Sequence, residues 1–219
     1  QMCIRDRYKD LWWVHAEPRP GLRTAVGKLS RYIATTRVSK HRLFAWLTPD
    51  ILPDSAVVAI AREDDYCFGV LQSRVHETWA RRKGTQLREA ESGGRYTSTT
   101  TFETFPFPWP LGSEPVADAR IEAIAAAARI LSVKRETWLN PSGASPAELT
   151  TRTLTNLYNE RPTWLAELHA ALDSAVLAAY GWPADIAEND LLEGLLGLNL
   201  SRPELHNGRT DEDESNGAA

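Results

Sequence analysis

The first half of the chain alternates short apolar runs with turn residues, which is typical of short strands joined by tight connections. Residues 32–36 and 43–47 predict two neighbouring strands, and the apolar, β-branched residues 55–61 predict a buried third strand. Apolar positions recur at helical spacing in residues 22–29 and 73–82. The pattern therefore predicts a small sheet accompanied by helices.

Helix-end signals and one β-prone run complete this half. Ser73 stands where a helix N-cap is expected, with His76 in place of the usual Glu three residues later, and Gly84 ends that helix. Residues 87–94 are polar and predict a loop. Residues 95–102 are rich in Thr and strongly β-prone, so they predict a further strand.

The second half has the apolar spacing of amphipathic helices. Pro162 near the start of one helix and Gly181 just past its end follow the usual placement of these two residues. The predicted helices span residues 115–139, 147–158, 162–180 and 188–200. The chain is thus predicted to be α+β, with a mixed, β-rich part followed by an all-α helical part.

Three alternate prolines in residues 105–110 force an extended path, and we place a domain boundary there. The predicted domains are residues 8–110 and 111–202, followed by an acidic tail, 203–219, whose composition predicts disorder. Residues 1–7 fit nothing that follows and resemble translated sequencing-adapter sequence, so they are set aside as a non-native prefix. The chain is then expected to be truncated at its N-terminus.

Charge is distributed unevenly along the chain. The net charge of −4 argues against nucleic-acid binding by bulk charge alone. Residues 8–110 nevertheless carry 15 Lys or Arg against 11 Asp or Glu, whereas residues 111–219 carry 8 against 17. A basic part joined to an acidic part indicates a nucleic-acid or acidic partner.

The most basic stretch is a hydroxyl-bearing turn between the first two predicted strands. From Pro18 to Pro49 there are seven Lys or Arg residues and no acid. Cations neutralise phosphates, hydroxyls bond phosphate oxygens, and Arg can pair with guanine. The turn, which we call the basic turn, contains Thr36, Arg37, Ser39, Lys40, His41 and Arg42. A solvated loop is an equal alternative for any such cluster, and the absence of acid favours binding.

A second strip follows further along the chain. Five consecutive hydroxyl residues, 97–101, come after Arg95, and Arg81, Arg82, Lys83 and Arg88 precede it. Composition alone favours an edge strand over a binding site here. A third group is aromatic and comprises Trp12, Trp13, Phe105, Phe107 and Trp109. Such residues can stack on bases, but packing at a domain junction is the favoured interpretation.

Catalytic and metal-binding patterns are not evident. The five histidines and two cysteines lack zinc-ligand spacing, and the cysteine usage is that of a reducing compartment. The Pro49-Asp50 and Pro53-Asp54 pairs are not followed by the Glu-x-Lys of a nuclease, and no glycine-rich loop follows a strand. Glu63-Asp64-Asp65 could bind a divalent cation, although a solvated loop is the commoner case. No apolar run approaches the roughly 20 residues of a membrane span.

Four separated motifs, in order, resemble the MmeI-like restriction–modification enzymes, which methylate adenine in DNA. The first runs from Arg31 to Phe44, and the second joins residues 59–71 to Arg74, His76, Glu77 and Trp79. The third motif begins with Arg95-Tyr96-Thr97 and ends with residues 101–108. The fourth begins with residues 153–159 and ends with Tyr180-Gly181-Trp182-Pro183. The resemblance covers roughly residues 12–201.

The resemblance implies a nuclease, a helical spacer, a methyltransferase core, a target-recognition domain and a C-terminal helical domain. This chain resembles the last two. The family's core binds S-adenosylmethionine through a Gly-rich motif and places a flipped adenine against Asn-Pro-Pro-Tyr/Phe. Neither motif is present, and Asn140-Pro141-Ser142 lacks the second proline and the aromatic. We therefore expect no catalytic, cofactor or metal residues here and S-adenosylmethionine only in the parent enzyme.

The leading hypothesis is a DNA target-recognition module, with double-stranded DNA and the preceding domains of the same protein as partners, in a prokaryotic cytoplasm. The candidate DNA-binding residues are Arg37, Ser39, Lys40, His41, Arg42, Arg74, Arg81, Arg82, Arg95, Thr97 and Thr99. One alternative is a separate specificity or protein-interaction subunit that docks through its acidic helical half. Another is a metal-dependent nuclease that uses Asp64, Asp65 and a histidine.

Overall fold

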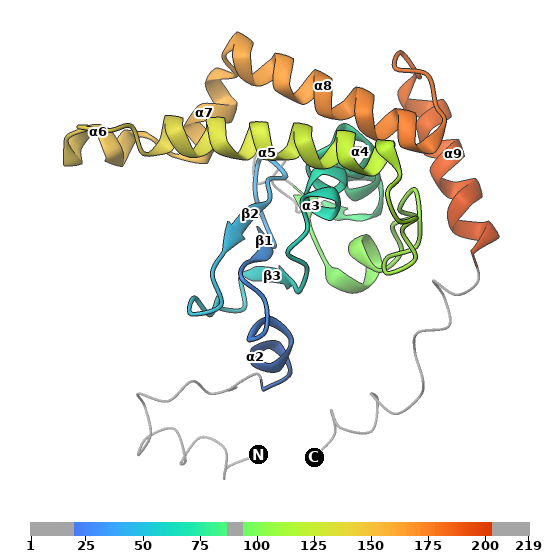
Figure 1. Cartoon of the computed structure of the whole chain (residues 1–219), viewed down its shortest axis with the longest axis horizontal. Helices are drawn as coiled ribbons and strands as arrows, with labels where there is room; N and C mark the ends of the chain where they lie inside the picture. The colour runs from blue at the N-terminus through green and yellow to red at the C-terminus, as the bar shows by residue number, and fades with distance from the viewer. Residues whose placement is uncertain (1–19, 87–93, 203–219) are drawn as a thin grey trace.

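A small antiparallel sheet forms the first part of the fold in a computed structural model that describes residues 20–86 and 94–202. Strand β1 (Tyr32–Thr36) lies between β2 (Ala45–Leu47) and β3 (Val57–Ile60), as Figure 1 shows. Ile33 pairs with Trp46 on one side and with Ile60 on the other. All three predicted strands are thus present, with β2 starting two residues later than predicted.

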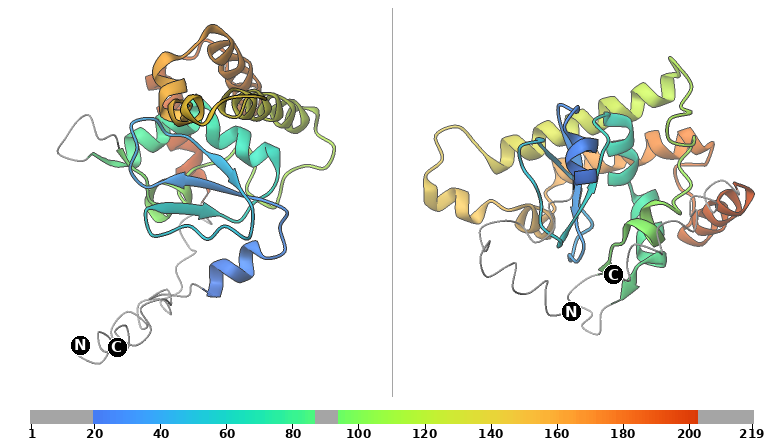
Figure 2. Two further views of the ribbon diagram at one scale, coloured as in Figure 1. Left: turned by 90° about the vertical axis from the view of Figure 1, so that its left-hand side faces the viewer. Right: turned by 90° about the horizontal axis from the view of Figure 1, so that it is seen from below.

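The two faces of β1 pack against different elements because side chains alternate along a strand. Ile33 belongs to the main core, which continues into the helices. Tyr32 and Ala34 form a smaller cluster with Val26 of α2 (Pro20–Val26). Helix α2 accordingly lies on the opposite side of the sheet from the long helices (Figures 1 and 2).

Two short helices, α3 (Asp65–Gln72) and α4 (Arg74–Lys83), follow the sheet. The Asp64 carboxylate caps α3 by accepting a hydrogen bond from the Cys67 amide. Ser73 is the N-cap residue of α4 as predicted, but its hydroxyl donates to the Val70 carbonyl and does not cap the helix. The first amide of α4 instead donates to Asp173 of another helix.

The second half is helical, and its predicted helices are present with one correction. The helices are α5 (Ala119–Leu139), α6 (Pro146–Thr151), α7 (Leu154–Glu160), α8 (Thr163–Tyr180) and α9 (Glu188–Ser201). The single helix predicted for residues 147–158 is two helices, α6 and α7. They are separate because the Thr153 hydroxyl accepts from the Asn156 amide and starts a new helix there. Gly181 ends α8 with a φ of 73°, as its position predicted.

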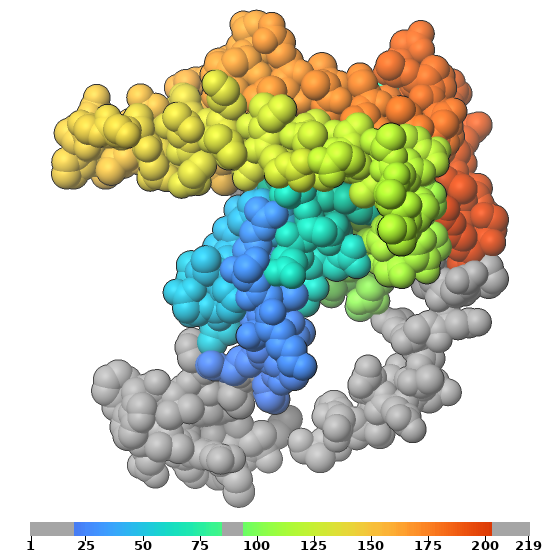
Figure 3. All heavy atoms as spheres, in the orientation of Figure 1, coloured from blue at the N-terminus to red at the C-terminus, as the bar shows by residue number. Residues whose placement is uncertain are grey.

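Helices α5 and α8 lie side by side in a layer above α3 and the sheet (Figure 1), and α5 with α6 extends as an arm beyond the sheet (Figure 3). Helix α5 approaches α3 closely at Gly69, where a Cβ would lie 2.7 Å from Ile124 Cγ2. One main core contains buried residues from Ile33 to Leu195. The parts before and after Pro110 therefore share a core, and the boundary drawn there stays a prediction.

The strand predicted for residues 95–102 is largely wrong. Strand β5 comprises only Gly94–Arg95, paired with β4 (Thr85–Gln86), and Ser98–Phe102 form a π-helical turn, η2. The Thr104 hydroxyl donates to the Thr100 carbonyl, and the Thr97 and Thr100 hydroxyls bond to each other. Such local bonds compete with strand pairing.

Several sequence predictions lie outside the described residues. They are the adapter-like prefix 1–7, Trp12, Trp13, most of the loop 87–94 with Arg88, and the tail 203–219. Within the ranges 20–86 and 94–202, no helix is both long enough and apolar enough to cross a bilayer.

A buried arginine ties the helical layer to the end of the basic turn. Arg135 of α5 is 5% exposed, and its guanidinium donates to the Phe44 carbonyl at 2.8 Å and to Gln72 Oε1 at 3.1 Å. The same Gln72 oxygen accepts the Phe44 amide at 2.9 Å. Arg135 forms none of the ion pairs between described residues. Its buried charge is therefore stabilised by neutral acceptors and by the Tyr158 ring, whose centroid lies 5.8 Å from the guanidinium carbon.

We predict that Arg135→Met lowers the free energy of unfolding by about 2 kcal/mol, because the buried Phe44 carbonyl loses its donor. Urea unfolding followed by circular dichroism measures this. Arg129→Met on the same helix is the control, because Arg129 is half-exposed and its ion pairs are solvent-screened. Equal losses in the two variants would contradict the prediction.

Candidate nucleic-acid interface

The two strips predicted from the sequence lie side by side in the structure. Val38 forms an antiparallel bridge with Arg95, and the Tyr96 amide donates to the Arg37 carbonyl at 2.7 Å. Arg42 Nη2 donates to the Gly94 carbonyl at 2.9 Å across 52 residues of sequence. The basic turn and the Thr-rich strip therefore form one continuous surface, which we call the joined strip.

Arg42 holds this junction together. Its Nη1 donates to Thr35 Oγ1 at 3.1 Å and to the Thr36 carbonyl, and its guanidinium lies 4.9 Å above the Tyr96 ring. Burial lowers the pKa of the Arg42 guanidinium. The predicted DNA contact of Arg42 stays a prediction, and the structure adds a positioning role, because both of its terminal nitrogens donate within the protein.

Beneath Arg42, the buried side chain of His76 fixes Tyr96. The Tyr96 hydroxyl lies 3.1 Å from His76 Nε2, and His76 Nδ1 lies 3.0 Å from the Leu71 carbonyl. A carbonyl only accepts, so Nδ1 carries the proton, and in the neutral ring Nε2 accepts from the hydroxyl. Burial lowers the pKa of His76 to about 3, so the ring stays neutral at physiological pH.

The surface side of the joined strip presents unpaired cations. Lys40, Arg82, Lys83 and Arg95 are exposed, and Arg37 is half-buried. None of these five residues takes part in an ion pair between described residues. Arg95 pairs across β4 with Thr85, which places it close to the basic last turn of α4. Cations left without carboxylates in this way remain available to an external anion.

The predicted hydroxyl contacts have mixed surroundings. Ser39 donates its hydroxyl to the His41 carbonyl at 2.7 Å and stabilises the turn. Thr97 is half-buried, whereas Thr99 is exposed on η2. Because the run is a helical turn and not a strand, its hydroxyls do not form one row.

Arg74 and Arg81 of α4 make their contacts within the protein, Arg74 with backbone carbonyls and Arg81 with carboxylates. Arg74 Nη2 donates to the carbonyls of Ala184 and Ile186 at 3.2 and 3.3 Å. Arg81 pairs with Glu77 at 3.2 Å and Glu188 at 3.4 Å. These two predicted DNA contacts therefore attach α4 to the helical half and do not belong to the unpaired cations of the joined strip.

The aromatic residues of the proline-rich segment pack, as the favoured interpretation predicted. Phe105 is 1% exposed and meets His76 edge-on at a centroid distance of 4.7 Å. The ring centroids of Phe107 and Phe105 are 4.9 Å apart, and the Arg120 guanidinium carbon lies 4.8 Å from the centroid of the Trp109 ring. Phe105 and Phe107 therefore fill a junction and are buried away from solvent, whereas Trp109 is partly buried.

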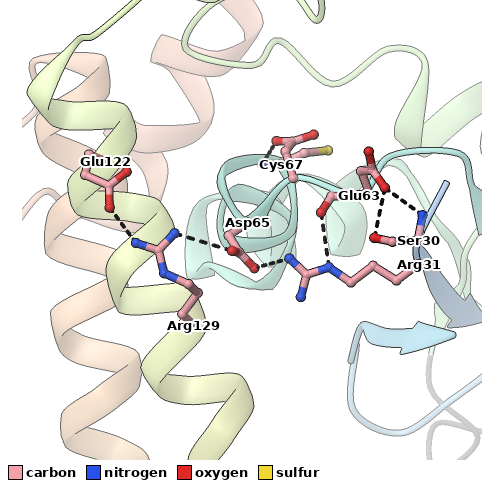
Figure 4. A network of polar contacts seen from close by, with 8 residues as sticks. Ser30, Arg31, Glu63, Asp65, Cys67, Glu122 and Arg129 are labelled. Carbon is pink, nitrogen blue, oxygen red and sulfur yellow. Dashed lines mark hydrogen bonds and ion pairs between the residues drawn. The ribbon is translucent and has the colours of Figure 1, made fainter. Parts of the chain in front are cut away.

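The acidic triplet 63–65 joins the sheet to the helices (Figure 4). Asp65 accepts from Arg31 at 2.8 Å and from Arg129 at 3.4 Å, and Glu63 accepts from the backbone and hydroxyl of Ser30. Asp64 caps α3 and pairs with Arg62 at 2.7 Å. Across the described parts of the chain, no group of three or more His, Cys, Asp or Glu could hold a metal ion. The metal-nuclease alternative gains no support here.

The fold and the joined strip define a small domain with an exposed basic surface, and comparison with known proteins shows what it is similar to. Residues 27–109 match the family model described as MmeI, target recognition domain. The match includes both strips, and it confirms the resemblance to the MmeI-like enzymes over these residues.

A solved structure shows the same fold. It is the structure of the Type IIL restriction-modification enzyme MmeI in complex with DNA. The similarity has a TM-score of 0.61 at 20% identity and covers 80% of this chain and 22% of that chain. The predicted α+β class is thereby confirmed, and the chain spans about a fifth of the length of that enzyme. No curated protein matches the sequence.

Some residues of the site could not be found by pattern. Tyr96 appears in the sequence analysis only within a family motif, and His76 only there and at a helix-cap position. Asn159, which contacts the basic turn, lies in the fourth motif far along the chain. The only sequence signal for these residues is that they belong to motifs that occur in the family's order. Such order does not indicate which residues lie close together in the fold.

We predict that Arg42→Ala lowers the free energy of unfolding by about 2 kcal/mol, because the Thr36 and Gly94 carbonyls lose a charged donor. Arg95→Ala, which removes an exposed cation, should change it by less than about 0.5 kcal/mol. Guanidinium-induced unfolding compares the two variants. Equal stability of Arg42→Ala and the wild type would contradict the positioning role.

Asp173 should make folding depend on pH. Burial raises the pKa of this carboxyl to about 6 from 3.8, although the Arg74 amide and guanidinium oppose the shift. The folded state therefore holds an extra proton between these values, so the stabilisation is full below pH 4 and is lost as pH rises through 6. Relative to Asp173→Asn, the wild type should lose about 2 kcal/mol between pH 4 and pH 7. Parallel stability profiles measured by urea unfolding at each pH would contradict this.

Proposed function

We propose that this chain recognises target DNA as part of an MmeI-like restriction–modification enzyme. The observation that carries the proposal is the joined strip, because cations from two distant stretches meet on one surface and form no ion pair with a carboxylate of residues 20–86 or 94–202. The strip lies within residues 27–109, the part that matches the target-recognition model. The solved structure with the same fold is a complex of MmeI with DNA.

The chemistry of the joined strip suits a DNA backbone. Lys40, Arg82, Lys83 and Arg95 offer ammonium and guanidinium donors to phosphates, and Thr99 offers an exposed hydroxyl. Arg37 is half-buried, and its Nε atom is fully buried without a hydrogen-bond partner.

The catalytic step belongs, in this proposal, to a part of the parent protein outside this chain. The parent would methylate adenine at N6 with S-adenosylmethionine as the methyl donor, in a prokaryotic cytoplasm. This chain would hold the target duplex in register while the other domains act on the flipped base. The acidic helical half, whose core is continuous with that of the β-rich part, would brace the recognition surface.

A salt series on the whole chain tests DNA binding. We predict that it binds double-stranded DNA and that affinity falls steeply between about 50 and 200 mM salt, because bound cations release counterions from phosphates. The double variant Arg82→Ala/Arg95→Ala should lower the slope of log affinity against log salt by about 2, at roughly 0.9 per phosphate contact. Gel-shift titration or fluorescence anisotropy measures both values.

Lys134→Ala is the control for loss of a surface cation elsewhere, since Lys134 is exposed on α5 and outside the joined strip. It should retain the wild-type slope. Binding that ignores salt, or an equal loss in the control and the double variant, would overturn the proposal. A chain that binds no DNA but captures a protein through its acidic helices would favour the interaction-subunit alternative.

A further inference from the structure

Helix α7 of the helical half reaches the basic turn. Asn159, near the end of α7, accepts a hydrogen bond from Lys40 Nζ at 2.8 Å through its Oδ1 atom. The same oxygen lies 2.9 Å from His41 Nε2. Asn159 is 50 residues beyond the end of the matched recognition domain at 109, so two parts of the sequence build one edge of the surface.

The donors fix the orientation of this amide. A Lys ammonium can only donate, so the Asn159 atom facing Lys40 is the oxygen, and His41 Nε2 must then carry a proton. The Asn159 nitrogen is left facing away from these two donors and has no hydrogen-bond partner in the described part of the chain. Lys40 uses one of its donors here and keeps two for an external acceptor.

The support beneath Asn159 is rigid. Leu157 is fully buried, and the Tyr158 hydroxyl lies 2.7 Å from Nε2 of His169 on α8. The Tyr158 ring also lies 6.0 Å from that of His41. Burial lowers the pKa of His169 to about 4, so this contact persists unchanged near neutral pH. Helix α7 is therefore a fixed platform for the turn.

Charge explains why an amide occupies this position. A carboxylate there would form an ion pair with Lys40 and cancel the cation that the turn presents. The amide restricts the same side chain without neutralising it. Lys40 thus has a defined direction and a full positive charge, the combination that a phosphate contact requires.

We propose that Asn159 is a positioning residue for the DNA interface, which orients Lys40 and His41 toward a backbone phosphate, and that α7 forms one edge of that interface. The inference rests on the proposed DNA-recognition function and extends it to the helical half. The ligand chemistry is a phosphodiester of duplex DNA. The exposed Asn159 nitrogen provides a further donor at the same edge.

The isosteric change Asn159→Asp separates charge from shape. We expect it to weaken duplex binding roughly three- to ten-fold at about 0.1 M salt and to lower the salt slope by about 1, because Lys40 is neutralised. Asn159→Ala should weaken binding less and keep the slope, because Lys40 loses its orientation but not its charge. Ser142→Asp adds the same charge in the exposed loop between α5 and α6 and should match the wild type.

A double-mutant cycle with Lys40→Ala tests whether Asn159 acts through Lys40. In the Lys40→Ala background, Asn159→Asp should cause no further change of slope. Thermal unfolding of every variant verifies folding, and the exposed position of Asn159 predicts unchanged midpoints.

The outcomes distinguish this inference from the function on which it rests. If the wild-type chain shows no salt-dependent binding, the proposed function fails. If the wild type binds but Asn159→Asp behaves as Ser142→Asp does, the DNA-recognition proposal stands and the role of Asn159 is overturned. An undiminished effect of Asn159→Asp in the Lys40→Ala background would also overturn the inference.

Discussion

The guanidinium of Arg42 is the interaction on which the candidate interface depends. It donates to the carbonyls of Thr36 and Gly94, which belong to two distant stretches, and it lies on the Tyr96 ring. It thereby reinforces a junction that the Val38–Arg95 bridge and the Tyr96 amide also hold. A planar, permanently charged group with several donors can bind two carbonyls and cover an aromatic face at once, whereas Lys cannot. One cation of the basic turn is thus used inside the protein, where it helps to hold the joined strip together.

A second buried arginine anchors the same segment from the other side. Arg135 of α5 donates a hydrogen bond to the carbonyl of Phe44, which follows Arg42 by two residues in the sequence. Neither guanidinium has a carboxylate partner among the described residues. An ion pair would neutralise positive charge beneath the strip, whereas carbonyl and amide oxygens satisfy the donors and leave the charge in place. The stretch from Pro18 to Pro49, which contains no acid, therefore supplies no carboxylate to the buried guanidinium groups or to the exposed cations.

The sequence predicted the elements better than the contacts. Strand β1 and helix α8 were located because apolar periodicity and the Pro162 and Gly181 signals are local. The Thr-rich run was misassigned because β propensity competes with hydroxyl–backbone bonds that depend on the following residues. The bridge between Val38 and Arg95 could not be predicted, since pattern does not specify which distant segments pair.

The same limit explains the mixed outcome for the candidate residues. The sequence identifies cations but not their partners, so it does not distinguish Arg81 from Arg82. In the structure Arg81 is neutralised by Glu77 and Glu188, while Arg82 is exposed and forms no ion pair between described residues. Residues one apart on a helix point about 100° from each other, so one faces the acidic α9 and the other does not. Glu188 of the acidic helical half thus takes part in neutralising Arg81 and leaves its neighbour Arg82 exposed.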